Sequence, residues 1–161
     1  MTELLTLYLL ADDFSETQAL ALFGWCRARG ADTFTVNVVG TPPAVERYGD
    51  LLDMRLRPYA VPTSKIPPVP AGQPGADWTR PCRLWSLTFE SAGILLSELK
   101  GDLLGYFGGE AWLEDPALYR GPDLMLGVVS HESEGVLRIR PDELPLLDQA
   151  DIPYRRKRDW Y

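Results

Sequence analysis

The sequence is poor in the residues on which most recognisable active sites and metal sites depend. Among its 161 residues there are one histidine and two cysteines, Cys26 and Cys82. Two cysteines are too few for a disulfide framework, and their neighbours lack the spacing of a zinc site. No glycine-rich phosphate loop or dinucleotide fingerprint follows a predicted strand. We therefore predict neither a cofactor nor a bound metal.

Positive charge is also scarce, with 16 lysines and arginines against 23 acidic residues and a net charge of −7. Nucleic acid is bound chiefly through clustered lysine and arginine, so the charge argues against it as a main ligand. An acidic domain gains association rate toward a basic protein partner.

The basic residues that are present gather at the C-terminus. Segment 155–161 holds four of them and one acid, which leaves a net charge of −10 on the rest of the chain. We interpret this basic tail as an intramolecular or oligomeric contact with the acidic body. RNA binding by the tail is the less favoured interpretation.

Long hydrophobic runs are missing as well. No apolar segment reaches the roughly 18 residues that a membrane span requires, and the apolar start of the chain has no basic segment before it. We expect a cytoplasmic protein. The composition, with 45% hydrophobic and 24% charged residues, is that of a globular protein, and the length favours a single domain over 1–161.

The patterns that remain predict an α+β (α/β-type) fold, with a mixed β-sheet of about five to six strands and two main helices packed on it. The segment from Leu4 to Leu10 is an apolar run that includes one threonine and one tyrosine, and it predicts a central strand. Ser15 and Gln18 have the spacing of a capping box that begins a helix over 16–29. The β-branched segment from Thr33 to Val39 predicts the next strand, which completes an N-terminal βαβ unit.

The middle of the chain is less regular. A short helix is predicted over 44–54, and a third strand over 83–89, followed by the second main helix over 92–104 with Ser91 as its cap. Between them, segment 58–81 contains seven of the fourteen prolines and no hydrophobic period, so we predict a long loop.

The clearest strand pattern lies in the C-terminal half. Segment 114–122 contains two prolines and predicts a loop, and segment 124–140 has two apolar runs around a polar break, which predicts a β-hairpin. A short helical turn is expected over 143–149. The hairpin turn contains His131, the only histidine in the chain.

His131 is the first candidate for chemistry, because imidazole and the nearby carboxylates of Glu132 and Glu134 suit a general base or a metal site. Three such groups in one turn rarely converge on one ion, and a solvated turn is the favoured interpretation. Ser130 or His131 would then bind backbone across the loop and fix its shape. Cys26 with His131 is a conceivable catalytic pair, but Cys26 belongs to an apolar helix face, where cysteine is inert.

A second candidate site combines an aromatic anchor with acids. Tryptophan and tyrosine dominate binding hot spots, and carboxylates complement a basic partner. The predicted contact surface consists of Glu110, Trp112, Glu114, Asp115 and Tyr119, with the His131 turn at its rim.

Our leading hypothesis is a protein-binding module, such as an inhibitor or an immunity-type protein that neutralises a basic partner by stoichiometric binding. Two alternatives stay open. One is a hydrolase or transferase that uses His131 with a carboxylate such as Asp12 or Glu110 in a pocket. The other is a structural or oligomerisation subunit, since a homo-oligomer would also use the basic tail.

Overall fold

The computed structural model describes residues 3–62, 83–100 and 109–157, which form a single α+β domain around one sheet. Within these ranges the sheet has six strands in the order β1-β6-β5-β4-β2-β3. The strands are β1 (Leu5–Leu10), β2 (Thr33–Gly40), β3 (Trp85–Ser86), β4 (Ala111–Arg120), β5 (Asp123–Val129) and β6 (Glu134–Ile139). The helices are α1 (Glu16–Ala28), α2 (Pro42–Leu56), α3 (Phe89–Glu98) and α4 (Leu144–Gln149).

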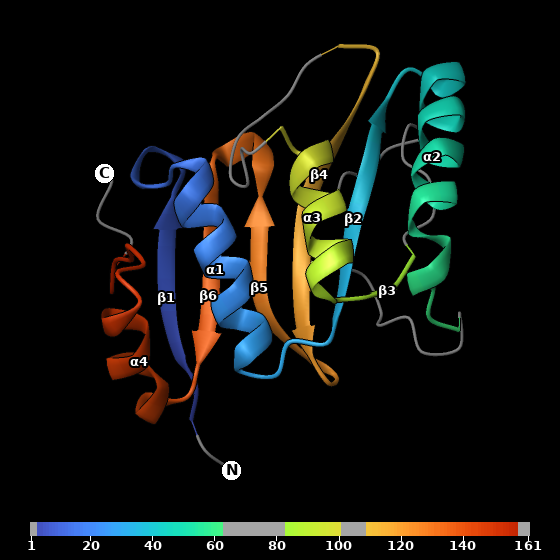
Figure 1. The fold of residues 1–161 in the computed structure, drawn as a ribbon. Coiled ribbons are helices and arrows are strands. Elements are labelled where there is room, and N and C mark those ends of the chain that lie inside the picture. Colours follow the sequence, from blue (N-terminus) through green and yellow to red (C-terminus); the bar gives the residue numbers. More distant parts are fainter. Residues whose placement is uncertain (1–2, 63–82, 101–108, 158–161) are drawn as a thin grey trace.

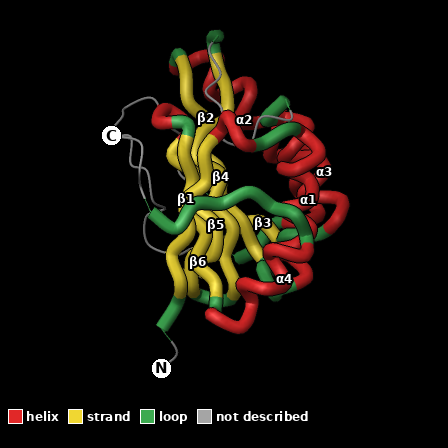
Figure 2. Tube along the Cα trace, turned by 90° about the vertical axis from the view of Figure 1, so that its left-hand side faces the viewer, coloured by secondary structure: helices red, strands yellow, loops and turns green. Residues whose placement is uncertain are grey.

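The helices and the sheet form two layers with the main hydrophobic core between them. Figures 1 and 2 show α1 and α3 on one face of the sheet, α2 beside β2, and α4 beside β1. Buried side chains from all four helices and from the strands join one apolar cluster. On the other face, a smaller cluster of Leu84, Ala117 and Tyr119 is buried.

The capping box predicted for α1 is confirmed. The backbone N–H of Gln18 donates to the Ser15 hydroxyl at 3.2 Å, and the backbone N–H of Ser15 donates to the Gln18 side chain at 2.8 Å. These bonds satisfy N–H groups that the first helical turn leaves without partners. The helix ends before Gly30, whose φ of +102° is one that other residues rarely adopt. The predicted apolar face is buried, namely Ala19, Leu22, Phe23 and Cys26.

The fold class is confirmed, including the N-terminal βαβ order, but the predicted mixed sheet is antiparallel. Strands β1 and β2 run parallel to each other, yet β6, β5 and β4 lie between them, so each neighbouring pair of named strands is antiparallel. A strand–helix–strand pattern indicates a crossover, but it does not say how many strands the crossover passes.

The prediction of a central position for the first strand was wrong, because β1 lies at one edge of the sheet. The start of the basic tail pairs with one residue of its outer side: Tyr8 and Arg155 exchange two backbone hydrogen bonds of 2.8 Å. The Arg155 guanidinium also lies 3.3 Å from the Asp13 carboxylate. The described part of the tail therefore contacts the acidic body, as the charge pattern predicted, and it protects an edge that would otherwise be open.

The third predicted strand is shorter than expected, and the following helix begins earlier. Only Trp85–Ser86 pair with β2, and α3 starts at Phe89 because Thr88, rather than Ser91, is its N-cap. Ser91 is the third helical residue and completes a capping box with Thr88. The helix predicted over 44–54 is confirmed as α2, which is longer because prolines suit the first turn of a helix.

The hairpin predicted over 124–140 is confirmed as β5 and β6, and the helical turn over 143–149 corresponds to α4. The loop predicted over 114–122 was wrong in its larger part, because β4 extends to Arg120 and only a tight turn separates it from β5. The proline-rich loop predicted over 58–81 lies outside the described residues beyond Pro62. Across the described ranges, no helix has the length and apolar character of a membrane span.

Candidate functional site

Strand β4 contains a bulge at the Asp-Pro sequence that had indicated a loop. Thr35 pairs with Ala117 whereas Asn37 pairs with Glu114, so β4 has one more residue than β2 between these pairs. Asp115 has a φ of +53°, a left-handed conformation that aspartate tolerates better than most residues. Proline cannot donate to a sheet ladder, and a bulge is one place where a central strand accepts it. The bulge therefore explains how Pro116 fits within the sheet.

Ser130 connects this bulge to the hairpin turn between β5 and β6. The backbone N–H of Asp115 donates to the Ser130 hydroxyl at 2.8 Å, and the backbone N–H of Ser130 donates to Asp115 Oδ1 at 2.8 Å. Both side chains are almost fully buried. The sequence predicted that Ser130 or His131 would bind backbone across the loop, whereas the Ser130 hydroxyl binds the backbone of β4 instead. This reciprocal pair fixes the residue before His131 against β4.

The structure brings His131 together with two acids that are distant in sequence. Side-chain ligand atoms of Glu114, Asp115 and His131 all lie within 4.8 Å of one another. His131 is exposed, whereas the exposed fractions of Glu114 and Asp115 are 7% and 2%. These partners differ from Glu132 and Glu134, which the turn sequence suggested. Sequence reasoning missed them because strand pairing, and not sequence proximity, brings the groups together.

Burial raises the pKa of Asp115 above its ordinary value, and the charge of Glu114 acts in the same direction. The backbone N–H of Ser130, the charge of His131 and the nearby Asn37 side chain lower that pKa but do not outweigh burial. Glu114 accepts a 2.9 Å hydrogen bond from the Trp112 indole N–H. The cluster thus holds Asp115 in a setting that disfavours its charge.

The five residues of the predicted contact surface do not form one exposed patch. Glu110 is exposed and Trp112 is half-buried, but Glu114, Asp115 and Tyr119 are buried. Tyr119 belongs to the small apolar cluster on the face of the sheet opposite the main core. Partner binding by these residues stays a prediction, and it would have to occur through Glu110 and Trp112.

Cys26 lies in the main core, with an exposed fraction of 0%. Burial raises the pKa of its thiol from 9.0 to about 12, an effect that the Arg120 charge only partly offsets. A thiol nucleophile must lose its proton to react, and a buried thiol with this pKa stays protonated at neutral pH. The structure therefore supports the prediction that Cys26 is inert.

We expect Cys26 to react with a disulfide reagent such as DTNB only when the protein unfolds, because the folded core excludes both the reagent and the thiolate form. The measurement is the rate of thiol labelling of the Cys82→Ser protein, with and without urea. Labelling of the native protein as fast as that of the unfolded chain would contradict this expectation.

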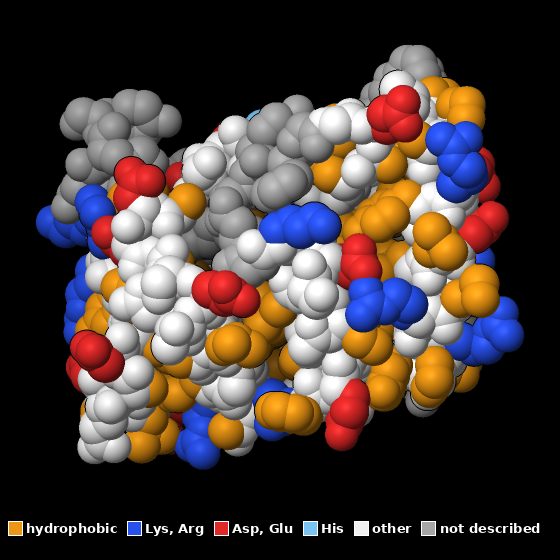
Figure 3. Space-filling view, turned by 45° about the horizontal axis from the view of Figure 1, so that its top comes forward, with side chains coloured by type: hydrophobic (Ala, Val, Ile, Leu, Met, Phe, Trp, Pro, Cys, Tyr) orange, Lys and Arg blue, Asp and Glu red, His pale blue; other side chains and the backbone are white. Residues whose placement is uncertain are grey.

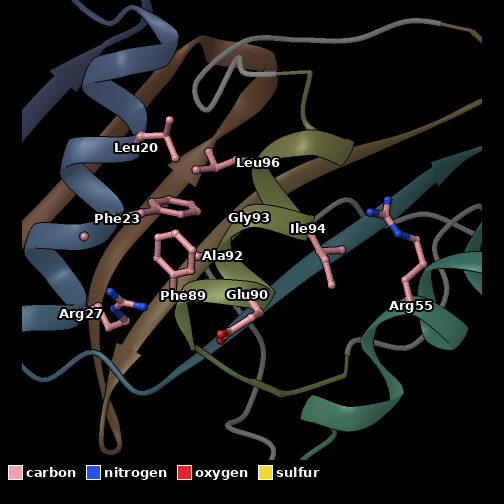
Figure 4. Close-up of a pocket in the computed structure, with 11 residues that line it drawn as sticks. Leu20, Phe23, Arg27, Arg55, Phe89, Glu90, Ala92, Gly93, Ile94 and Leu96 are labelled. Atoms are coloured by element: carbon pink, nitrogen blue, oxygen red, sulfur yellow. The ribbon is translucent and has the colours of Figure 1, made fainter.

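A second candidate site is an apolar groove between α1 and α3. Its hollow has a volume of about 430 Å³. Figure 4 shows Leu20 and Phe23 of α1 facing Phe89 and Leu96 of α3. The exposed fractions of Leu20 and Phe89 are 52% and 75%, and Figure 3 shows hydrophobic side chains in patches over the helical layer. The groove is therefore open to solvent and to a partner.

The rim of the groove carries both signs of charge. The Arg27 guanidinium lies 5.6 Å from the centre of the Phe89 ring, a geometry that favours a cation–π contact. Glu90 and Arg55 also line the groove, and Arg55 forms an ion pair with Glu98. Sequence reasoning missed this site because it predicted Phe89 at the end of a strand, although Leu20 already lay outside the predicted apolar face of α1.

Comparisons with protein-family models, curated proteins and solved structures found no match to this chain.

Proposed function

We propose that the chain is a protein-binding module that takes an apolar segment of a basic partner into the groove between α1 and α3. The observation that carries this proposal is the exposure of Leu20 and Phe89 beside the hollow. Monomeric proteins seldom leave large apolar side chains together at a concave surface, and such places commonly bind a partner. Stoichiometric occupation of the groove would suit an inhibitor or an immunity-type protein.

The preference for a basic partner rests on charge. The net charge of −7 attracts a basic protein over long distances and raises its rate of association, while the apolar groove supplies the contact that holds it. The groove is lined by Arg27, Arg55 and Glu90, and Arg55 is already paired with Glu98, so these charges would orient the partner, and the preference for a basic partner rests on the net charge of the chain. The affinity should therefore depend on Phe89, and the association rate on salt.

The experiment compares three immobilised forms of the full chain as bait in an extract of the source cells: wild type, Phe89→Asp, and the control Leu146→Asp. Leu146 is also an exposed leucine, but it lies on α4. We expect wild type and Leu146→Asp to retain the same basic protein, and Phe89→Asp to retain at least about tenfold less of it. The recovered pair should form an equimolar complex on size-exclusion chromatography, and its association should slow at high salt.

Two results would overturn the proposal. One is equal retention by Phe89→Asp, which would place binding elsewhere. The other is a wild-type protein that self-associates through the groove, with Phe89→Asp monomeric. That second result would favour the alternative of an oligomerisation subunit.

A further inference from the structure

We propose that Glu114, Asp115 and His131 bind one divalent transition-metal ion. This inference is independent of the protein-binding proposal, because it concerns the bulge of β4 and the hairpin turn rather than the groove between α1 and α3. From the sequence we predicted no metal, because His131 was considered with Glu132 and Glu134 of its own turn, and three groups in one turn rarely converge on one ion.

The geometry of the donors suits a small cation. Their ligand atoms lie within 4.8 Å of one another, and the ligand atoms of a tetrahedral zinc ion are about 3.4 Å apart. His131 is exposed whereas the two carboxylates are buried, so binding an ion would require the imidazole to move closer to them. Its exposure also leaves the ion a route from solvent.

An unpartnered buried atom points to a missing ligand. Asp115 Oδ1 accepts the Ser130 N–H, but Oδ2 is buried and no described donor meets hydrogen-bond geometry with it, although the Asn37 side chain is close enough to lower the pKa of the carboxyl. Buried polar atoms are nearly always paired, and an exception often marks an ion or a water. Because only 2% of Asp115 is exposed, bulk solvent does not supply that partner.

The charge balance of the cluster points in the same direction. In the described ranges no lysine or arginine forms an ion pair with Glu114 or Asp115. Two adjacent buried carboxylates are costly when the exposed His131 is the cationic group beside them in the described ranges, and a divalent cation would neutralise both. Neutralisation by a proton on Asp115 is the competing explanation, and the experiment below distinguishes the two.

The donors are held in position before any ion arrives. The Trp112 indole N–H donates to Glu114 Oε1 at 2.9 Å and orients that carboxylate. The reciprocal hydrogen bonds between Asp115 and Ser130 fix one carboxylate and the start of the turn. Hydrogen bonds from neighbouring residues to metal-binding side chains orient those side chains and raise the affinity for the metal.

The donor set identifies the class of ion. One imidazole with two carboxylates suits Zn²⁺ and neighbouring transition metals, whereas Mg²⁺ and Ca²⁺ prefer oxygen ligands alone. Three protein ligands would leave at least one position for water or for a bound molecule.

The experiment titrates the full chain, metal-free and without an affinity tag, with Co²⁺ and Zn²⁺. We expect one cobalt ion per chain, visible absorption bands of low-symmetry Co²⁺, and displacement of the cobalt by Zn²⁺. His131→Ala and Asp115→Asn should each weaken binding by at least about tenfold. The control Glu132→Gln removes an exposed acid beside His131 and should leave the affinity unchanged.

Thermal unfolding distinguishes a variant that no longer binds metal from one that no longer folds. Asp115→Asn removes a buried charge while preserving shape, so the metal-free variant should be at least as stable as the metal-free wild type. Zn²⁺ should raise the Tm of wild type and Glu132→Gln, but not that of Asp115→Asn. Absence of saturable binding by the wild type would overturn the proposal and favour a protonated Asp115. The assigned ligands would be overturned if His131→Ala bound Zn²⁺ as tightly as the wild type does. They would also be overturned if the wild type bound Ca²⁺ as tightly as Zn²⁺.

Discussion

Replacing Arg120 by alanine is expected to lower the free energy of unfolding by about 3–5 kcal/mol. Arg120 lies at the end of β4, and its guanidinium donates to Glu143 Oε1 at 2.6 Å and to the Arg29 carbonyl at 3.1 Å. It thereby connects the sheet to the end of α1 and to the segment before α4. The side chains are only 16% and 6% exposed, so the variant leaves the Glu143 charge buried with only the exposed Arg140 guanidinium, 4.0 Å away, beside it.

Urea denaturation measures this loss, and Arg138→Ala is the matched control because Arg138 is an exposed arginine on β6. The control should change the free energy of unfolding by no more than about 0.5 kcal/mol. A double variant, Arg120→Met with Glu143→Leu, should recover most of the stability, since no unpaired charge remains. Equal losses in Arg120→Ala and Arg138→Ala would contradict the importance of the buried ion pair.

The same ion pair predicts a loss of stability in acid. Burial alone would raise the pKa of Glu143, but the Arg120 guanidinium and the Arg140 backbone N–H stabilise its charge and lower the pKa below the ordinary 4.5. A carboxylate with a lowered folded-state pKa stabilises the protein above the unfolded-state pKa. That contribution is lost as the pH falls below 4.5 and through the folded-state value. Glu143→Gln should therefore show a shallower fall in stability over this range.

The second large effect is expected at a core phenylalanine. Phe34→Ala should lower the free energy of unfolding by about 3–5 kcal/mol, because it leaves a cavity in the core. Phe34 is 0% exposed and pairs across the sheet with Leu118, which is also 0% exposed. The fixed strands on either side limit how far the cavity can collapse. The measurement is the urea concentration at the midpoint of unfolding. This midpoint should fall, while the slope of the free energy of unfolding against urea concentration stays unchanged.

Phe89→Ala is the matched control, since it removes the same side chain from the rim of the groove. Phe89 is 75% exposed, and its described ring contact is with Arg27. We expect a loss of no more than about 1 kcal/mol. A loss as large as that of Phe34→Ala would show that α3 depends on Phe89 for its packing, and would contradict the interpretation of this residue as a free binding anchor.

Features determined by near neighbours could be predicted from the sequence. The capping box of Ser15 and Gln18 depends on residues three apart, and the hairpin depends on two apolar runs separated by a short polar break. The cap of α3 was misassigned because Thr88 and Ser91 both suit that position, and the choice between them depends on where the preceding strand ends. Ser91 is buried, and its hydroxyl donates to the Ser86 carbonyl at 2.7 Å, a contact that the sequence pattern does not reveal.

The candidate sites were much less predictable. The sequence identified His131, Glu114 and Asp115 as chemically interesting, but it assigned the acids to a contact surface and the histidine to other partners. A bulge opposite Val36 turns Asp115 and Pro116 from an apparent loop into part of a strand. The Asp-Pro pair in an otherwise apolar segment was the available signal, because a bulge is one of the few places where a strand accepts proline.

The sequence by itself determined the α+β class, the main helices and the C-terminal hairpin. Hydrophobic periods of 3.6 and 2 residues report which face of an element is buried, and caps and turns depend on local hydrogen bonds. Only the tertiary structure decided that β1 is an edge strand, that the sheet is antiparallel, and that His131 lies beside two buried acids. The hydrophobic period of a helix or strand shows which of its faces is buried, but not which element covers that face. The order of strands in the sheet depends on contacts between residues far apart in the chain.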